Sequence, residues 1–143
     1  MKFEEKSSMK DENRRKRKPF DIKERTFEYA LQAIRLFQEL QAQKDSAGWI
    51  IGKQFLRSAT SIGANVHEAQ SGESKADFIH KYSIAQKEAR ESLYWLKLLD
   101  TSKIVMTGTL HSLINETNEI TAIITSIIVS YILFQLPDNQ DRE

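Results

Sequence analysis

The stretch between Pro19 and Pro137 contains no proline, and this feature most constrains how the chain can fold. Proline interrupts a helix because it lacks an amide donor and clashes with the preceding turn. The 143 residues also include only five glycines, too few for the frequent turns of a β-sandwich or a Rossmann sheet. A stretch of this length and composition predicts one all-α domain with one core.

Four segments of this stretch, at about 22–43, 46–70, 74–99 and 109–135, carry apolar residues at alternating steps of three and four. Such spacing keeps one stripe of each helix against its neighbours, as in a helical bundle. The expected core stripes are Phe27, Ala30, Ile34 and Phe37, widened by Leu31 and Leu40; Phe55, Ala59, Ile62, Val66 and Ala69; Phe78, Tyr82, Ala85, Ala89, Ser92, Leu96 and Leu99; and Leu110, Leu113, Thr117, Ile120, Ile124, Ile127, Tyr131 and Phe134.

Short connections separate the four segments. Ser74, with Asp77 three residues on, predicts the start of the third helix, and Thr107 or Thr109 the start of the fourth. Short connections make consecutive helices antiparallel. We therefore expect residues 20–136 to form an antiparallel up-down-up-down four-helix bundle.

Positive charge is concentrated at the N-terminus. Residues 1–18 hold eight basic and four acidic residues, whereas the whole chain has a net charge of +1, so residues 19–143 carry 1 − 4 = −3. The N-terminal segment has neither helical spacing nor the apolar run of a secretory signal. We expect a disordered basic arm over residues 1–19 and a polar C-terminal tail over residues 137–143. The absence of cysteine fits a reducing, cytoplasmic compartment.

The last helical segment is apolar around most of its second half, and Glu116 and Glu119 are its only charges. A membrane span is one interpretation, but Ser and Thr interrupt an apolar run of only about 17 residues, short of the roughly 20 that a span needs. A single bundle covers about one stripe per helix. We therefore expect no membrane partner and a homo-oligomer, in which another copy covers a second apolar face. The residues of that face are Ile114, Ile123, Ile128 and Ile132.

A polar stripe lies beside the apolar one on the second helix, at Arg57, Ser61, Asn65 and Glu68. Such a row can form a hydrogen-bonded network. We interpret it as a structural network between helices or subunits, with a recognition or catalytic pocket as the alternative. On the same helix Gly63 predicts close helix packing, with a ligand-contacting backbone as the alternative.

The sequence contains none of the usual catalytic or metal-binding motifs: no His-Glu-x-x-His, no glycine-rich phosphate loop and no nucleophile elbow. Its histidines are His67, His80 and His111. A di-iron bundle needs two Glu-x-x-His pairs, whereas this chain has one imperfect pair, Asp77-x-x-His80, with Asp in place of Glu. We therefore predict a protein that is not an enzyme and has no catalytic residue, metal or cofactor.

Two groups of basic residues offer phosphate contacts. They are Arg14, Arg15, Lys16, Arg17 and Lys18 in the arm, and Lys87, Arg90 and Lys97 near one face of the third helix. Copies of these groups around an oligomer would add their contacts. We predict binding of RNA or another nucleic acid, with a protein-interaction scaffold as the alternative. Acidic residues share the third helix, so its bases are also consistent with an ordinary solvent-exposed face that binds no partner. We expect no aromatic residues among these bases, and therefore no stacking on nucleobases.

The segment Arg57-Ser58-Ala59-x-Ser61-Ile62-x-Ala64-Asn65-x-x-Glu68 resembles the second-helix signature of a known family. The family comprises four-helix bundle proteins encoded by intervening sequences in bacterial 23S ribosomal RNA genes. Phe78, Ala85 and residues 88–93 are similar to its third-helix pattern. One departure is Ala69 after Glu68, where many members have glycine.

The resemblance implies a four-helix bundle that assembles as a homopentamer in bacteria. The chain also resembles the accessory variability determinant of diversity-generating retroelements, a basic pentamer that binds nucleic acid and a reverse transcriptase. The net negative charge of residues 19–143 differs from the charge of that basic pentamer.

Overall fold

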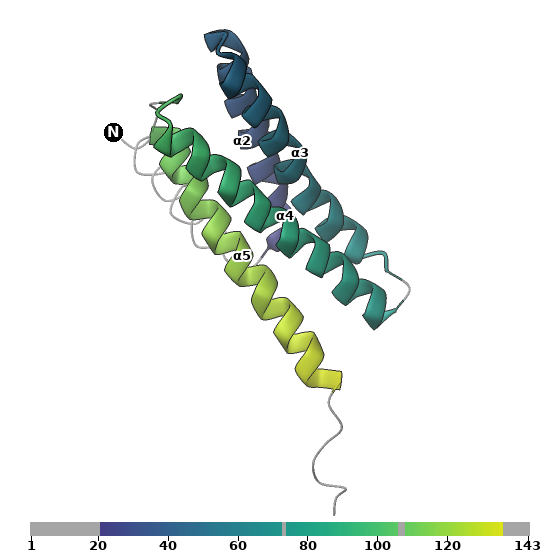
Figure 1. The fold of residues 1–143 in the computed structure, drawn as a ribbon. Coiled ribbons are helices and arrows are strands. Elements are labelled where there is room, and N and C mark those ends of the chain that lie inside the picture. Colours follow the sequence, from purple (N-terminus) through teal and green to yellow (C-terminus); the bar gives the residue numbers. More distant parts are fainter. Residues whose placement is uncertain (1–20, 73, 106–107, 136–143) are drawn as a thin grey trace, which may run out of the picture.

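The computed structural model describes residues 21–72, 74–105 and 108–135, and these residues form four helices (Figure 1). The helices are α2 (Ile22–Gln43), α3 (Ser46–Ala69), α4 (Lys75–Thr101) and α5 (Gly108–Gln135). Their bounds lie within two residues of those predicted from the sequence. The predicted arm, residues 1–19, and the predicted tail, residues 137–143, lie outside the described residues.

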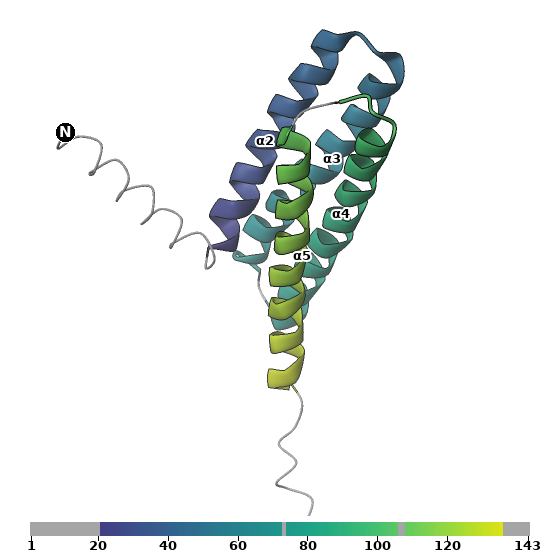
Figure 2. The same ribbon diagram turned by 90° about the vertical axis from the view of Figure 1, so that its left-hand side faces the viewer.

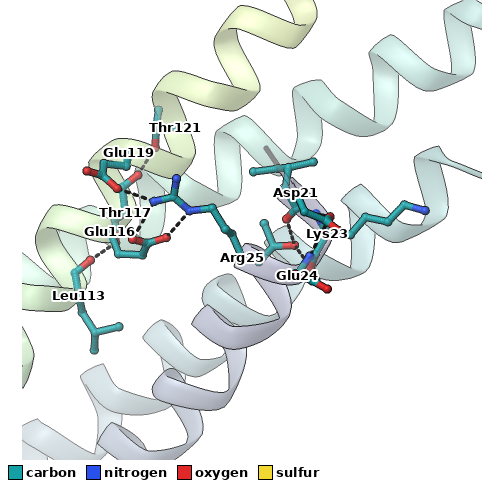
Figure 3. Close-up of polar contacts among 11 residues, drawn as sticks. Asp21, Lys23, Glu24, Arg25, Leu113, Glu116, Thr117, Glu119 and Thr121 are labelled. Carbon is teal, nitrogen blue, oxygen red and sulfur yellow. Dashed lines mark hydrogen bonds and ion pairs between the residues drawn. The ribbon is translucent and has the colours of Figure 1, made fainter. Parts of the chain in front are cut away.

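Side-chain caps explain where the first three helices begin. Asp21 accepts hydrogen bonds from the amides of Lys23 and Glu24 (Figure 3), and Asp45 accepts one from Gly48 at 2.7 Å. Ser74 accepts one from the amide of Asp77 at 3.1 Å, which confirms the predicted cap. Each cap satisfies amides that have no partner within the first turn. The predicted cap of α5 at Thr109 is wrong, because the helix already begins at Gly108, and the alternative cap at Thr107 lies outside the described residues.

The helices pack in sequence order, and α5 returns to α2, so the predicted up-down four-helix bundle is confirmed. The contact between α2 and α5 is the least extensive of the four. Figure 2 shows that the C-terminal part of α5 continues beyond the start of α2. This part of α5 still contacts α4, where the rings of Tyr131 and Phe78 stack with centroids 4.2 Å apart.

The predicted stripes of α3 and α4 are buried, apart from a partly buried Phe78, and so are the first five residues of the α5 stripe. Ile127 and Tyr131 are only partly buried, and Phe134, which is 85% exposed, was wrongly assigned to the core. It lies on the part of α5 that continues beyond α2.

The predicted stripe of α2 is wrong at Phe27, which is 58% exposed, and at Ile34, which is 40% exposed. Ala30, Leu31 and Phe37 are partly buried, and Leu40 is buried as predicted. The buried residues of α2 are Ile22, Thr26, Tyr29, Ala33, Leu36 and Leu40. Two of these, Thr26 and Tyr29, carry hydroxyl groups. The Tyr29 hydroxyl hydrogen-bonds to Thr117 at 2.6 Å and the Thr26 hydroxyl donates to the Ile22 carbonyl at 2.8 Å, so neither burial leaves an unsatisfied group.

Gly63 allows α3 to approach α2 closely. A Cβ atom at this position would lie 3.2 Å from the carbonyl oxygen of Thr26 and 3.3 Å from its carbonyl carbon. These are backbone atoms of a packed helix, which cannot rotate away as a side-chain end can. The close contact agrees with the helix-packing interpretation of Gly63.

We predict that Gly63→Val destabilises the bundle by about 1–3 kcal/mol more than Ala64→Val, because the added side chain forces α2 and α3 apart. Ala64 is the exposed neighbour on the same helix, so it gives the cost of valine there without a clash. Because glycine is about 1 kcal/mol less favourable than alanine in a helix, helix propensity works against the predicted difference. Urea unfolding followed by circular dichroism measures both variants. Equal losses of stability would contradict the close contact.

Candidate nucleic-acid interface

Lys87, Arg90 and Lys97 lie on one exposed face of α4. Their steps of three and seven residues bring them to the same side of the helix. From residue 80 to residue 97 the other exposed residues in this register are His80, Ser83 and Tyr94, so no acidic residue interrupts the series. We call these six residues the α4 stripe.

The acids of α4 closest to the stripe pair with α3 instead. The Arg57 guanidinium contacts Glu91, and it lies 3.8 Å from Oε2 of Glu88. The side chains of Glu88 and Glu91 are 14% and 28% exposed, whereas that of Arg57 is 53% exposed. These acids lie between the helices, so the exposed face of α4 is less mixed in charge than its sequence indicates.

The three bases of the stripe form no ion pair with any described residue. From Lys87 to Lys97 the helix rises about 15 Å. Their positive charge is therefore available along this length to a ligand in solution. The five predicted arm bases, residues 14–18, lie outside the described residues.

The predicted polar row on α3 does not form one continuous network. Ser61 and Asn65 donate hydrogen bonds to backbone carbonyls one turn earlier, those of Arg57 and Ser61, at 2.7 and 2.8 Å. The ends of the row reach α4 instead, where Glu68 contacts Lys81 at 3.1 Å and Arg57 contacts its two acids. Ser and Asn often bond the backbone of their own helix in this way, so the row supplies two separate ion-pair contacts between α3 and α4.

Glu88 is the least satisfied acid of this surface. Its Oε2 atom is buried and makes no hydrogen bond with the described residues. Burial raises the pKa of Glu88 above its ordinary value, the negative charge of Glu91 raises it further, and the charges of Arg57 and Lys87 oppose both effects.

A second ion-pair cluster joins α2 to α5 (Figure 3). Arg25 donates two hydrogen bonds to Glu116, both at 2.9 Å, and also contacts Glu119. The Arg25 side chain is only 11% exposed, and hydrogen bonding to Glu116 raises its pKa despite burial. Sequence analysis did not identify this cluster, although two acids alone on an apolar helix were a signal for a buried cation.

The four isoleucines predicted for an oligomer interface have different environments. Ile114, Ile123 and Ile128 are partly buried against the core of their own chain, whereas Ile132 is exposed. Three further apolar residues near the end of α5 are exposed: Val129, Leu133 and Phe134. The described part of the chain therefore leaves an apolar surface at this end, which we call the α5 end.

By length and composition, α5 is also apolar enough to cross a membrane. Its first half nevertheless belongs to the bundle, because Leu110, Leu113, Thr117 and Ile120 are fully buried. Its two carboxylates are paired with Arg25 of α2. These contacts place α5 within the bundle.

The histidines lie apart. The ring of His67 is 3.3 Å from the Lys23 carbonyl, that of His111 is 3.6 Å from Asp100, and His80 is exposed on α4. Within the described ranges, no three residues of the types His, Cys, Asp and Glu are grouped so that they could hold a metal ion.

Comparisons with known proteins give a consistent result. A family model described as 23S rRNA-intervening sequence protein matches residues 18–126. The chain is also similar to a crystal structure from Bacteroides thetaiotaomicron, of a protein with unknown function from the S23 ribosomal protein family. The two share 40% identity and a TM-score of 0.71, over 76% of this chain and 98% of the other. No curated protein matches the chain.

We predict that Arg57→Gln lowers the free energy of unfolding by about 0.5–1 kcal/mol at pH 7, since it removes a half-exposed, solvent-screened guanidinium that faces two partly buried carboxylates. The raised pKa of Glu88 means that its ionisation opposes folding as the pH rises, and Arg57 offsets this cost. The loss should therefore shrink when the pH falls and Glu88 becomes protonated.

Urea unfolding at pH 7 and pH 4.5 measures this difference. Glu88→Gln combined with Arg57→Gln should recover part of the stability at pH 7. Arg35→Gln, at an exposed base with no ion pair to a described residue, is the matched control. A loss that grows as the pH falls would contradict the assignment.

Proposed function

The chain belongs to the 23S rRNA-intervening sequence protein family, and on this basis we propose that it is a non-enzymatic homo-oligomer that binds RNA in the bacterial cytoplasm. RNA would contact the α4 stripe and the arm bases Arg14–Lys18. The observation that carries this proposal is the acid-free, unpaired series of bases along α4.

Phosphate binding explains why such a series is useful. Each base that neutralises a phosphate releases condensed counterions, which favours binding at low salt. One protomer offers three described bases over about 15 Å, a weak site by itself. Several protomers that hold one RNA would raise the affinity through effective concentration.

The α5 end supports assembly of such protomers. Apolar residues grouped on one exposed surface are typical of protein interfaces. We propose that a second copy covers the α5 end, at Ile132 and its exposed neighbours, and that five copies assemble, as the family resemblance implies. Partly buried Ile128 and Ile123 would extend this contact along α5, and Ile114, about 27 Å from Ile132 along the helix, would be its farthest member.

A protein-interaction scaffold is the second candidate. Phe27 and Ile34 form a separate exposed apolar surface on α2, which a different protein could cover. In that case Arg57, Asn65 and Glu68 would serve the bundle alone, and the protein would bind no RNA.

We predict that the protein binds structured RNA with an affinity that falls steeply as salt increases. Substitution of Lys87, Arg90 and Lys97 by Gln should weaken binding and reduce the magnitude of the slope of log K against log salt by about 0.7–0.9 for each phosphate that is no longer neutralised. Alanine substitution of Arg14–Lys18 should act in the same direction.

Fluorescence anisotropy with labelled RNA between 25 and 300 mM salt gives these slopes. The matched control changes Lys23, Arg35 and Lys53 to Gln, since it removes the same charge from exposed positions on α2 and α3. Equal effects of the two triple variants would show that net charge, and not the α4 stripe, controls binding. No RNA binding at 25 mM salt would favour the scaffold.

We also predict that the wild-type protein sediments as an oligomer at micromolar concentration. Ile132→Asn combined with Leu133→Asn should produce a lighter, folded species, because it makes the α5 end polar. Phe27→Asn combined with Ile34→Asn should leave the assembly intact. A stable wild-type monomer in sedimentation velocity would refute the oligomer, and dissociation by the α2 variant alone would place the interface on α2.

A further inference from the structure

We propose that the α4 stripe binds single-stranded RNA and that Tyr94 stacks on an unpaired base. This inference rests on the proposed function and specifies the class of RNA. It departs from the sequence-based expectation that no aromatic residue would lie among the bases of the third helix.

Tyr94 occupies the centre of the basic part of the stripe. It follows Arg90 by four residues and precedes Lys97 by three, so the three side chains share one side of α4. Its side chain is 58% exposed, among the most exposed large apolar side chains of the described residues. An exposed aromatic ring between cations is the arrangement of single-strand binding surfaces, where phosphates and bases are contacted in turn.

Trp95 supports the position of the Tyr94 ring. The Trp95 side chain packs against the core, and its indole nitrogen donates a hydrogen bond to Glu91 at 3.2 Å. The rings of Tyr94 and Trp95 meet edge to face, with centroids 5.1 Å apart and planes at 68°. Because Trp95 is anchored, it limits the positions that the Tyr94 ring adopts and reduces the ordering needed for a ligand to stack.

The length of the stripe fits a short run of nucleotides. The distance of about 15 Å from Lys87 to Lys97 corresponds to about four nucleotides, since stacked nucleotides in one strand are about 3.4 Å apart. In an RNA duplex the faces of the bases are covered by their neighbours, so Tyr94 would reach only phosphates and sugars. An unpaired base can turn away from its neighbours in the strand and stack on the Tyr94 ring.

The experiment measures the binding of two labelled probes, a 12-nucleotide oligouridine and a 12-base-pair RNA duplex, at one low salt concentration. We expect Tyr94→Ala to weaken oligouridine binding by roughly 5- to 150-fold, the range for removal of one stacked base, and to change duplex binding less than twofold. Tyr94→Phe and Tyr94→Trp should retain oligouridine binding because they keep an aromatic face.

Phe27→Ala is the matched control, since Phe27 is equally exposed but lies on α2. It should change neither affinity. Oligouridine binding that is unchanged by Tyr94→Ala but weakened by Gln at Lys87, Arg90 and Lys97 would overturn the stacking inference and leave the proposed function standing. Equal weakening of both probes would also overturn it, since a general disturbance of the surface would then explain the loss. Failure of wild-type protein to bind either probe would overturn the stacking inference, and failure to bind structured RNA in the salt titration as well would refute the proposed function itself.

Discussion

The contact of Arg57 with Glu88 and Glu91 holds the acids next to the α4 stripe on the side of α4 that faces α3. The two carboxylates lie between α3 and α4, where the guanidinium faces both. Arg57 compensates one of their two negative charges there, and neither carboxylate lies in the register of the bases on the outer side of the same helix. The contact stabilises little by itself because Arg57 is half-exposed and partial burial of Glu88 is costly. Its larger consequence is a separation of charge across one helix.

The packing of α5 has a comparable consequence for apolar surface. Arg25 holds Glu116 and Glu119 against the first turn of α2, and Tyr29 bonds Thr117 in the core below. Because these contacts lie at the start of α2, the rest of α5 continues beyond the start of α2. There α5 no longer has α2 to pack against. Apolar residues that a fully overlapping helix would cover are therefore left exposed near Phe134. The proposed second copy would complete the packing that α2 is too short to supply.

Sequence reasoning located the helices accurately because proline, glycine and capping residues act locally. It identified the core residues of α3 and α4 for a related reason, since in both helices they follow each other at regular steps of three and four. It failed on α2, where Tyr29 and Thr26 are buried with satisfied hydroxyl groups while Phe27 is exposed. It also did not show that Tyr94 lies exposed between the bases of α4, because tyrosine occurs both in cores and on surfaces. Only the partners on neighbouring helices decide between these positions.

The net negative charge of residues 19–143 does not oppose the proposed binding of RNA. Screening limits the reach of an exposed charge to about 8 Å at physiological ionic strength. A phosphate on the outer face of α4 therefore responds mainly to Lys87, Arg90 and Lys97, and little to acids on the far side of the bundle. Screening also weakens those three bases at higher salt, whereas stacking on Tyr94 depends less on ionic strength. A site of this kind would hold an unpaired strand under conditions in which its phosphate contacts alone no longer suffice.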